Sequence, residues 1–128
     1  MIEINNLTKF SVDKKSFSQV AKKVLLGENR ETETLSLAFV EKAEIAKLNK
    51  KYRGKNKPTD VLSFLFNEKD YLGEIVICPE VVKEKKEKIM EVFVHGILHL
   101  CGYDHEKSRA EEIKMQEKEE KYLEILNF

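Results

Sequence analysis

Hydrophobic positions recur along the first part of the chain with two different spacings. Ile2 and Ile4 alternate with polar neighbours, which predicts a short strand. From Asp13 the apolar side chains follow a helical spacing, and Gly27 is expected just past the end of that helix. Residues 34–40 alternate again with apolar side chains on one face and small or β-branched ones on the other, which predicts a strand covered on part of both faces.

A second helix is expected from about Glu41. Its inner stripe would consist of Ile45, Leu48 and Tyr52, and Gly54 would end it. The next apolar run predicts a buried strand, because it is short and rich in β-branched and aromatic residues. That run covers residues 61–66.

A polar turn at residues 67–70 separates this run from another apolar segment at residues 71–78. The short separation predicts that the two strands pair as an antiparallel hairpin. Pro79 is suited to the first turn of a helix, and the apolar stripe from there to Leu100 is compatible with one continuous helix. A local break near residues 85–88 is the alternative.

The C-terminal segment carries a capping box, Ser108-Arg109-Ala110-Glu111, which predicts the start of a final helix. We expect this helix to reach about Leu126, with Ile113 and Tyr122 among its few apolar contacts. The charged run at residues 111–121 is interpreted as a solvated helical face.

Composition narrows the class of protein. The 128 residues suffice for one domain with one core, and 23 basic residues balance 23 acidic ones. The chain therefore has no net charge that would attract it to nucleic acid or membrane. A nucleic-acid surface would have to be a local cluster of basic residues. Cys78 and Cys101 are too few for a disulfide framework, and no secretory signal or long apolar run is evident, so we expect a cytoplasmic protein.

All three histidines lie within one short stretch, VHGILHLCGYDH. His95 and His99 are four residues apart, so on a helix their imidazoles share one face. Gly102 allows the chain to end the helix and turn back, which returns His105 toward the first two rings. Three nitrogen ligands with an open fourth position are typical of a catalytic zinc site. A histidine cluster that serves packing or a pH response is the alternative.

The spacing HxxxHxxGxxH resembles the zinc site of metzincin proteases. Those enzymes carry a glutamate general base after the first histidine, whereas this chain has Gly96. Cys101 would point about 200° away from His99 on a helix, so we expect it to be a small buried hydrophobe and not a fourth ligand.

The motif HGILHLCGYDH at residues 95–105 is similar to the signature of the YbeY family of bacterial metal-dependent endoribonucleases. A second block, PTDVLSF at residues 58–64, is preceded by Tyr52-Arg53 and resembles that family's other hallmark. Together with residues 73–77, the likeness extends from about Leu48 to His105.

The resemblance implies an α+β domain spanning residues 1–128, with a small mixed four-stranded sheet, packed helices and a zincin-like YbeY fold. It also implies two helices separated by a loop within residues 79–100. The implied function is zinc-dependent, single-strand-specific endoribonuclease activity in rRNA maturation and ribosome quality control, with one Zn2+ per chain. Implied partners are single-stranded RNA, mainly rRNA, and the ribosome or ribosome-associated proteins; we expect no membrane or DNA partner.

Arg53 is the residue most suited to the transition state of phosphodiester cleavage, because a guanidinium can hold two phosphoryl oxygens. The resemblance supports this role, since Arg53 matches the position that the YbeY family uses in its cleft. A basic cluster surrounds it and would bind substrate, or would simply complement the end of a helix. The cluster consists of Lys50, Lys51, Lys55 and Lys57. Tyr52, next to Arg53, would add a stacking face for a base or would belong to the core.

Thr59 and Asp60 are expected to shape the cleft through backbone hydrogen bonds, and Asp104 to orient a histidine or to act only in a turn. Two other functions remain open. A zinc peptidase is disfavoured by Gly96, because a leaving amine needs a proton that the missing glutamate normally relays. The other is a ribosome assembly factor whose metal is structural.

Overall fold

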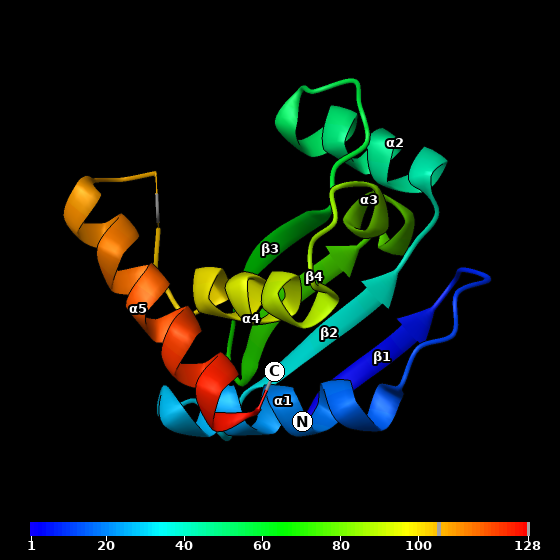
Figure 1. The fold of residues 1–128 in the computed structure, drawn as a ribbon. Coiled ribbons are helices and arrows are strands. Elements are labelled where there is room, and N and C mark those ends of the chain that lie inside the picture. Colours follow the sequence, from blue (N-terminus) through cyan, green and yellow to red (C-terminus); the bar gives the residue numbers. More distant parts are fainter. Residues whose placement is uncertain (105, 128) are drawn as a thin grey trace.

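The structure is a computed structural model that describes residues 1–104 and 106–127. A four-stranded sheet with the order β1-β2-β4-β3 forms its centre (Figure 1). The first three strands in this order are parallel to one another, and β3 is antiparallel to β4. The sheet is therefore mixed, as predicted. The strands are β1 (Ile2–Asn6), β2 (Thr34–Phe39), β3 (Val61–Glu68) and β4 (Tyr71–Ile77).

Five helices are described. Asp13 caps the first one by accepting a hydrogen bond from the backbone N–H of Ser16, and Ser108 caps the last by accepting from that of Glu111. Gly54 ends the second helix with a φ of 69°, as its position in the sequence predicts. The helices are α1 (Lys14–Gly27), α2 (Lys42–Arg53), α3 (Pro79–Glu84), α4 (Ile89–Leu100) and α5 (Arg109–Ile125).

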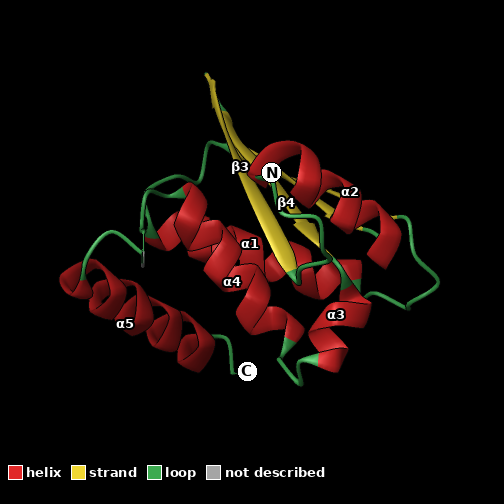
Figure 2. Ribbon diagram, turned by 90° about the horizontal axis from the view of Figure 1, so that it is seen from above, coloured by secondary structure: helices red, strands yellow, loops and turns green. Residues whose placement is uncertain are grey.

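The main hydrophobic core lies between one face of the sheet and helices α1 and α4. Phe17 of α1 contacts Phe39 of β2 and Phe93 of α4 edge to face, which joins the two helices and the sheet. Helix α5 packs on the outside of α4 (Figure 2). The α+β fold class that the sequence predicts is confirmed.

A second, smaller cluster covers one end of the opposite face of the sheet. Ile45 of α2 and Val81 of α3 pack there against Val40, Leu62 and Val76. The chain leaves this cluster along α2 and enters β3, so the end of α2 and the start of β3 lie next to each other (Figure 1).

Residues 79–100 form two helices, α3 and α4, with the break at the predicted place. Lys86 adopts a φ of 58°, and the backbone N–H of Glu87 bonds the carbonyl of Val82 at 3.1 Å. This turn replaces a continuous helix, so the two-helix alternative is correct.

Expectations about one helix end and about the burial of two segments were wrong. Gly27 is the last residue of α1 and not the residue beyond it, and a Cβ at this glycine would overlap the ring of Tyr122 in α5. Strand β3 is not a buried strand, because it lies at the edge of the sheet, where Leu65 is 66% exposed. Ile113 is exposed, and Met115 fills the core from α5 in its place.

Within the described part of the chain, every helix is too short or too polar to cross a membrane.

Candidate metal and nucleic-acid cleft

A cleft of about 920 Å³ lies between α4 and α5 on one side and the segment from the end of α2 to β3 on the other. We call these sides the helical wall and the strand wall. The helical wall consists of Glu87, Glu91, Val92, His95, His99, Glu106, Gln116, Glu119, Glu120 and Leu123. The strand wall consists of Tyr52, Arg53, Thr59, Asp60, Val61, Leu62, Ser63 and Phe64. Histidines and the candidate arginine thus face one cavity.

His95 and His99 lie one turn apart on the cleft face of α4, as their spacing predicts. Their ring centroids are 4.9 Å apart with an interplanar angle of 75°. Both side chains are only partly buried, whereas the neighbouring residues on the opposite face of α4 are in the core. The helix therefore presents two imidazoles to the cavity from a rigid support.

Glu119 of α5 hydrogen-bonds Nδ1 of His95. The bond favours the tautomer with its proton on Nδ1, which places the lone pair of the ring on Nε2. Metal-binding histidines in proteins are commonly held in this way by a carboxylate. The donor set therefore suits a divalent transition metal such as zinc.

The third predicted ligand, His105, lies outside the described residues. Among the residues that are described, no group of three or more His, Cys, Asp or Glu side chains is arranged to hold a metal ion. Asp104, expected to orient a histidine or act in a turn, is exposed, does not line the cleft, and accepts a hydrogen bond from the backbone N–H of Glu106 at 3.0 Å. Such a contact is typical of a turn residue, and the orienting role of Asp104 stays a prediction.

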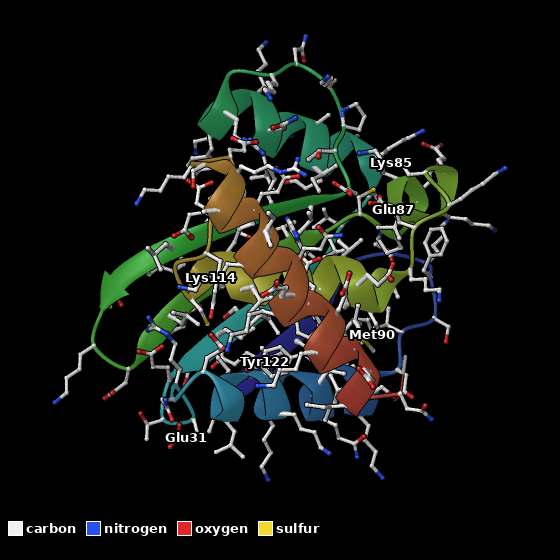
Figure 3. All side chains as sticks on the ribbon, turned by 60° about the vertical axis from the view of Figure 1, so that its left-hand side comes forward. Glu31, Lys85, Glu87, Met90, Lys114 and Tyr122 are labelled. Carbon is white, nitrogen blue, oxygen red and sulfur yellow. The ribbon has the colours of Figure 1, made fainter. Side chains whose placement is uncertain are left out.

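The turn that leads toward His105 is anchored from α1. Gly102 adopts a φ of 103°, and the hydroxyl of Tyr103 donates to Glu28 at 2.8 Å. The same carboxylate accepts from Tyr122 at 2.5 Å and from Lys118 at 3.4 Å, both in α5. Tyr122 lies between α5 and α1 (Figure 3).

We call Glu28, Tyr103, Lys118 and Tyr122 the Glu28 clamp. Burial alone would raise the pKa of Glu28, but the hydrogen bonds from Tyr122 and Tyr103, with the charge of Lys118, hold this pKa below its usual range. The carboxylate is therefore ionised and ties the turn after α4 and the α5 helix to the end of α1.

Arg53 is the last residue of α2 and lines the strand wall. The loop that follows is fixed to α2 by Asn49, which is 2% exposed and donates from Nδ2 to the carbonyl of Lys57 at 2.8 Å. The helical stripe placed Tyr52 in the core, with a base-stacking face as the alternative, and the residue is 56% exposed and lines the cleft beside Arg53. Asn49 is buried in its place, so the buried face of α2 is rotated relative to the predicted one.

The lysines predicted to bind substrate do not line the cleft. Lys50, Lys51, Lys55 and Lys57 are exposed on the segment that carries Arg53. In the described part of the chain, Arg53 is the one lysine or arginine that lines the cavity. The helical wall, in contrast, contributes five glutamates.

Thr59 and Asp60 line the strand wall, and a carboxylate oxygen of Asp60 accepts from the Thr59 hydroxyl at 3.2 Å and from the backbone N–H of Val61 at 2.9 Å. Burial would raise the pKa of Asp60, but a hydrogen bond with Glu87, together with Lys85 3.7 Å away, holds it below its usual range. Glu87 and Lys85 lie in the loop between α3 and α4 (Figure 3).

The pKa of Glu87 shifts in the opposite direction and is raised. Loss of solvent and the neighbouring Asp60 raise the pKa of Glu87 to about 7. The two carboxyl groups therefore share a proton near neutrality across the two walls. A group with such a pKa can donate or accept a proton at physiological pH.

Gly96 lies on the side of α4 that faces the sheet. A Cβ at this position would come within 3.2 Å of Ile75 and 3.4 Å of the Ser63 hydroxyl. A glutamate base of the metzincin type would therefore crowd the side chains of Ile75 and Ser63, which favours glycine at this position. Cys101 packs against the main core, and burial raises the pKa of its thiol to about 12, so it stays protonated.

Sequence reasoning missed Glu119 and Glu87. Glu119 was assigned to a solvated face, yet it stands four residues after Met115 and three before Tyr122, on the buried stripe of α5. A glutamate within such a stripe was the available signal. Glu87 had no local signal, because its partner Asp60 is distant in sequence.

The fold and cleft define an α+β protein with a candidate metal centre. A family model described as Endoribonuclease YbeY matches residues 3–127. The chain is similar to the Endoribonuclease YbeY of Thermotoga maritima, with 42% identity over 98 residues, or 70% of this chain and 65% of the relative. It thus spans just under two thirds of the length of that relative.

The Endoribonuclease YbeY of Aliarcobacter butzleri is 37% identical over 135 residues, which cover 95% of this chain and 92% of the relative. The solution structure of TM1509 from Thermotoga maritima superposes with a TM-score of 0.71 at 35% identity, covering 98% of this chain and 89% of that one. The chain belongs to the Endoribonuclease YbeY family, as the motifs suggested.

Proposed function

We propose that this chain is a zinc-dependent endoribonuclease that cleaves single-stranded RNA in the cytoplasm, in rRNA maturation and ribosome quality control. Residues 1–128 would form one hydrolase domain. Membership of the Endoribonuclease YbeY family supports the activity. The observation that carries the proposal is the meeting of His95, His99 and Arg53 in one cleft, with Glu119 bonded to the first histidine.

His95, His99 and His105 would hold one metal ion per chain. When bound, zinc would supply a Lewis acid and lower the pKa of water to about 7, which makes a dedicated protein base unnecessary. Glu119 would keep the His95 ring in the ligating tautomer.

Arg53 would bind the scissile phosphate from the strand wall. Its planar guanidinium can donate two parallel hydrogen bonds to phosphoryl oxygens, and these bonds strengthen as negative charge develops. Thr59 and Asp60 would keep the wall in shape beside it, since their side chains bond each other and the backbone of β3.

Two other functions compete with this one. The packing of Gly96 against Ile75 argues against a peptidase that relies on a glutamate base there. A ribosome assembly factor with a structural metal would need the same histidines, so only activity separates it from a nuclease.

The test is cleavage of a labelled single-stranded RNA by zinc-loaded protein, beside the same RNA annealed to its complement, a DNA of the same sequence and unfolded casein. We expect cleavage of the single-stranded RNA alone, loss of cleavage with a chelator, and recovery when zinc is added back. Chelator-sensitive proteolysis would favour the peptidase. Ribosome binding without RNA cleavage would favour the assembly factor.

A further inference from the structure

Tyr52 is a large aromatic side chain that the fold leaves exposed at the cleft. It is 56% exposed, although its neighbours on α2, Ile45 and Asn49, are fully buried. Leaving an aromatic ring in water forgoes a substantial hydrophobic gain, so an exposed ring that lines a cavity indicates a ligand surface.

The ring is also held in place. Phe64 of β3 contacts Tyr52 edge to face, with centroids 5.1 Å apart and an interplanar angle of 65°. Phe64 itself packs against the smaller hydrophobic cluster, so it supports Tyr52 from a fixed position. A ligand that stacks on Tyr52 would therefore lose little side-chain entropy.

Cations flank this ring. Arg53 follows it in sequence and lines the same wall, and Nζ of Lys51 lies 5.1 Å from the centroid of Tyr52. A nucleotide presents an anionic phosphate next to a planar base. The phosphate would suit the cations, and the base would suit the aromatic ring. Stacking also avoids the repulsion that the glutamates of the opposite wall exert on phosphate, because a base is neutral.

We propose that Tyr52 is the base-stacking platform of the cleft and that it contributes to the choice of unpaired nucleotides. The inference rests on the proposed function, since it names how that substrate is held. In a duplex the base faces are covered by their neighbours, whereas an unpaired base can be splayed onto an aromatic ring. Stacking of this kind tolerates any base, so Tyr52 would select single strands without selecting sequence.

The test compares binding of two strands that carry equal charge: a labelled single-stranded oligoribonucleotide and an abasic ribose-phosphate chain of the same length. Anisotropy gives their affinities for the parent, Tyr52→Leu and Tyr52→Phe. Leucine keeps the apolar bulk without the aromatic face, and phenylalanine keeps the face. Phe66→Leu is the matched control, because Phe66 is a 40% exposed ring on β3 that does not line the cleft.

We expect the parent and Tyr52→Phe to prefer the base-bearing strand, and Tyr52→Leu to lose about tenfold of that preference. Phe66→Leu should behave as the parent does. In single-turnover cleavage, Tyr52→Leu should mainly raise the protein concentration that gives half of the maximal rate. Failure of the parent to cleave RNA would contradict the proposed function alone. Equal preference in the parent and Tyr52→Leu, or no preference in the parent, would overturn the stacking role whether or not RNA is cleaved.

Discussion

The two walls of the cleft differ in charge and in how they are built. The helical wall carries two histidines and five glutamates on α4, α5 and the loops before them, and these helices are anchored by the core and the Glu28 clamp. The strand wall carries Arg53 and exposed aromatic surface at the end of α2 and on an edge strand. One wall is suited to a cation, and the other to an anion with a planar group attached.

This division has an electrostatic consequence. The glutamates of the helical wall would repel an RNA phosphate, and under the proposed function a divalent ion there would offset part of their charge. On the strand wall, the charge of Arg53 opposes that of the Asp60 carboxylate. Binding of metal and RNA should therefore depend on different residues, and substitutions on the two walls should separate them.

The largest effect is expected from His99→Ala on the helical wall. Loss of a ligand should lower the metal content from about one ion per chain to nearly none, and RNA cleavage should fall with it. Elemental analysis of the purified protein measures this change. Cys101→Ala is the control, and it should keep its metal because its protonated thiol packs against the core. If the metal content is unchanged in His95→Ala, His99→Ala and His105→Ala, the proposed metal centre is contradicted.

Arg53→Ala should reduce the maximal single-turnover rate by about 100- to 1000-fold, the usual cost of losing one donor to a developing charge. Metal content should stay at the parent level, since the strand wall holds no predicted ligand. Arg53→Lys should also be impaired, because a point charge cannot reproduce the planar fork. If Arg53→Ala cleaves at the parent rate once saturated, Arg53 is only a surface cation.

Glu119→Gln should weaken zinc affinity by about 10- to 100-fold, because the carboxylate that holds Nδ1 of His95 is lost. Competition with a chromogenic zinc chelator measures the affinity. Glu120→Gln makes the same charge change on the same wall and should have a much smaller effect. Equal losses in the two variants would mean that only the overall charge of the wall matters.

Alanine substitution of Lys50, Lys51, Lys55 and Lys57 should weaken RNA binding without lowering the saturated rate, because these lysines lie outside the cleft. Each lost phosphate contact should flatten the logarithmic salt dependence by about 0.7. Binding titrations at several salt concentrations give the slope. A saturated rate reduced as far as that of Arg53→Ala would mean that the lysines reach the reacting phosphate.

The smallest effect concerns Glu87, whose pKa in the folded chain is about 7 against an ordinary 4.5. Folding favours the protonated form of Glu87. The contribution of this form to the stability of the fold is therefore full below the unfolded pKa and is lost as the pH rises through about 7. Glu87→Gln should therefore melt at a higher temperature than the parent at pH 8, with little difference at pH 4.5. Glu91→Gln on the same wall is the control. A difference that is independent of pH would exclude titration of Glu87 as its cause.

Much of the fold could be predicted because its signals are local. The caps at Asp13 and Ser108, the stop at Gly54 and the hairpin of β3 and β4 depend on neighbouring residues, and all are present. The edge position of β3 depends on the order of strands, which no local pattern encodes. Its apolar run therefore predicted burial that the sheet does not provide.

Part of the candidate site was predictable on both walls, since Arg53, Thr59 and Asp60 line the cleft opposite the two histidines. The helical spacing of His95 and His99 was sufficient to place both rings on one face of α4. Glu119 reaches His95 only through the packing of α5 on α4, and the charged composition of α5 concealed it. The apolar stripe could not decide between core and cleft for Tyr52, because helical periodicity does not reveal that polar Asn49 takes the buried place.

The Glu28 clamp also bears on the order in which the molecule is completed. Glu28 bonds partners 75 and 94 positions further along the chain, Tyr103 and Tyr122. During synthesis these bonds cannot form until Tyr103 and Tyr122 have emerged, and α5, which brings Glu119 to His95, is made after α4. A nascent chain would carry the α4 histidines without their supporting carboxylate, so under the proposed function it would bind zinc more weakly until α5 has emerged and docked.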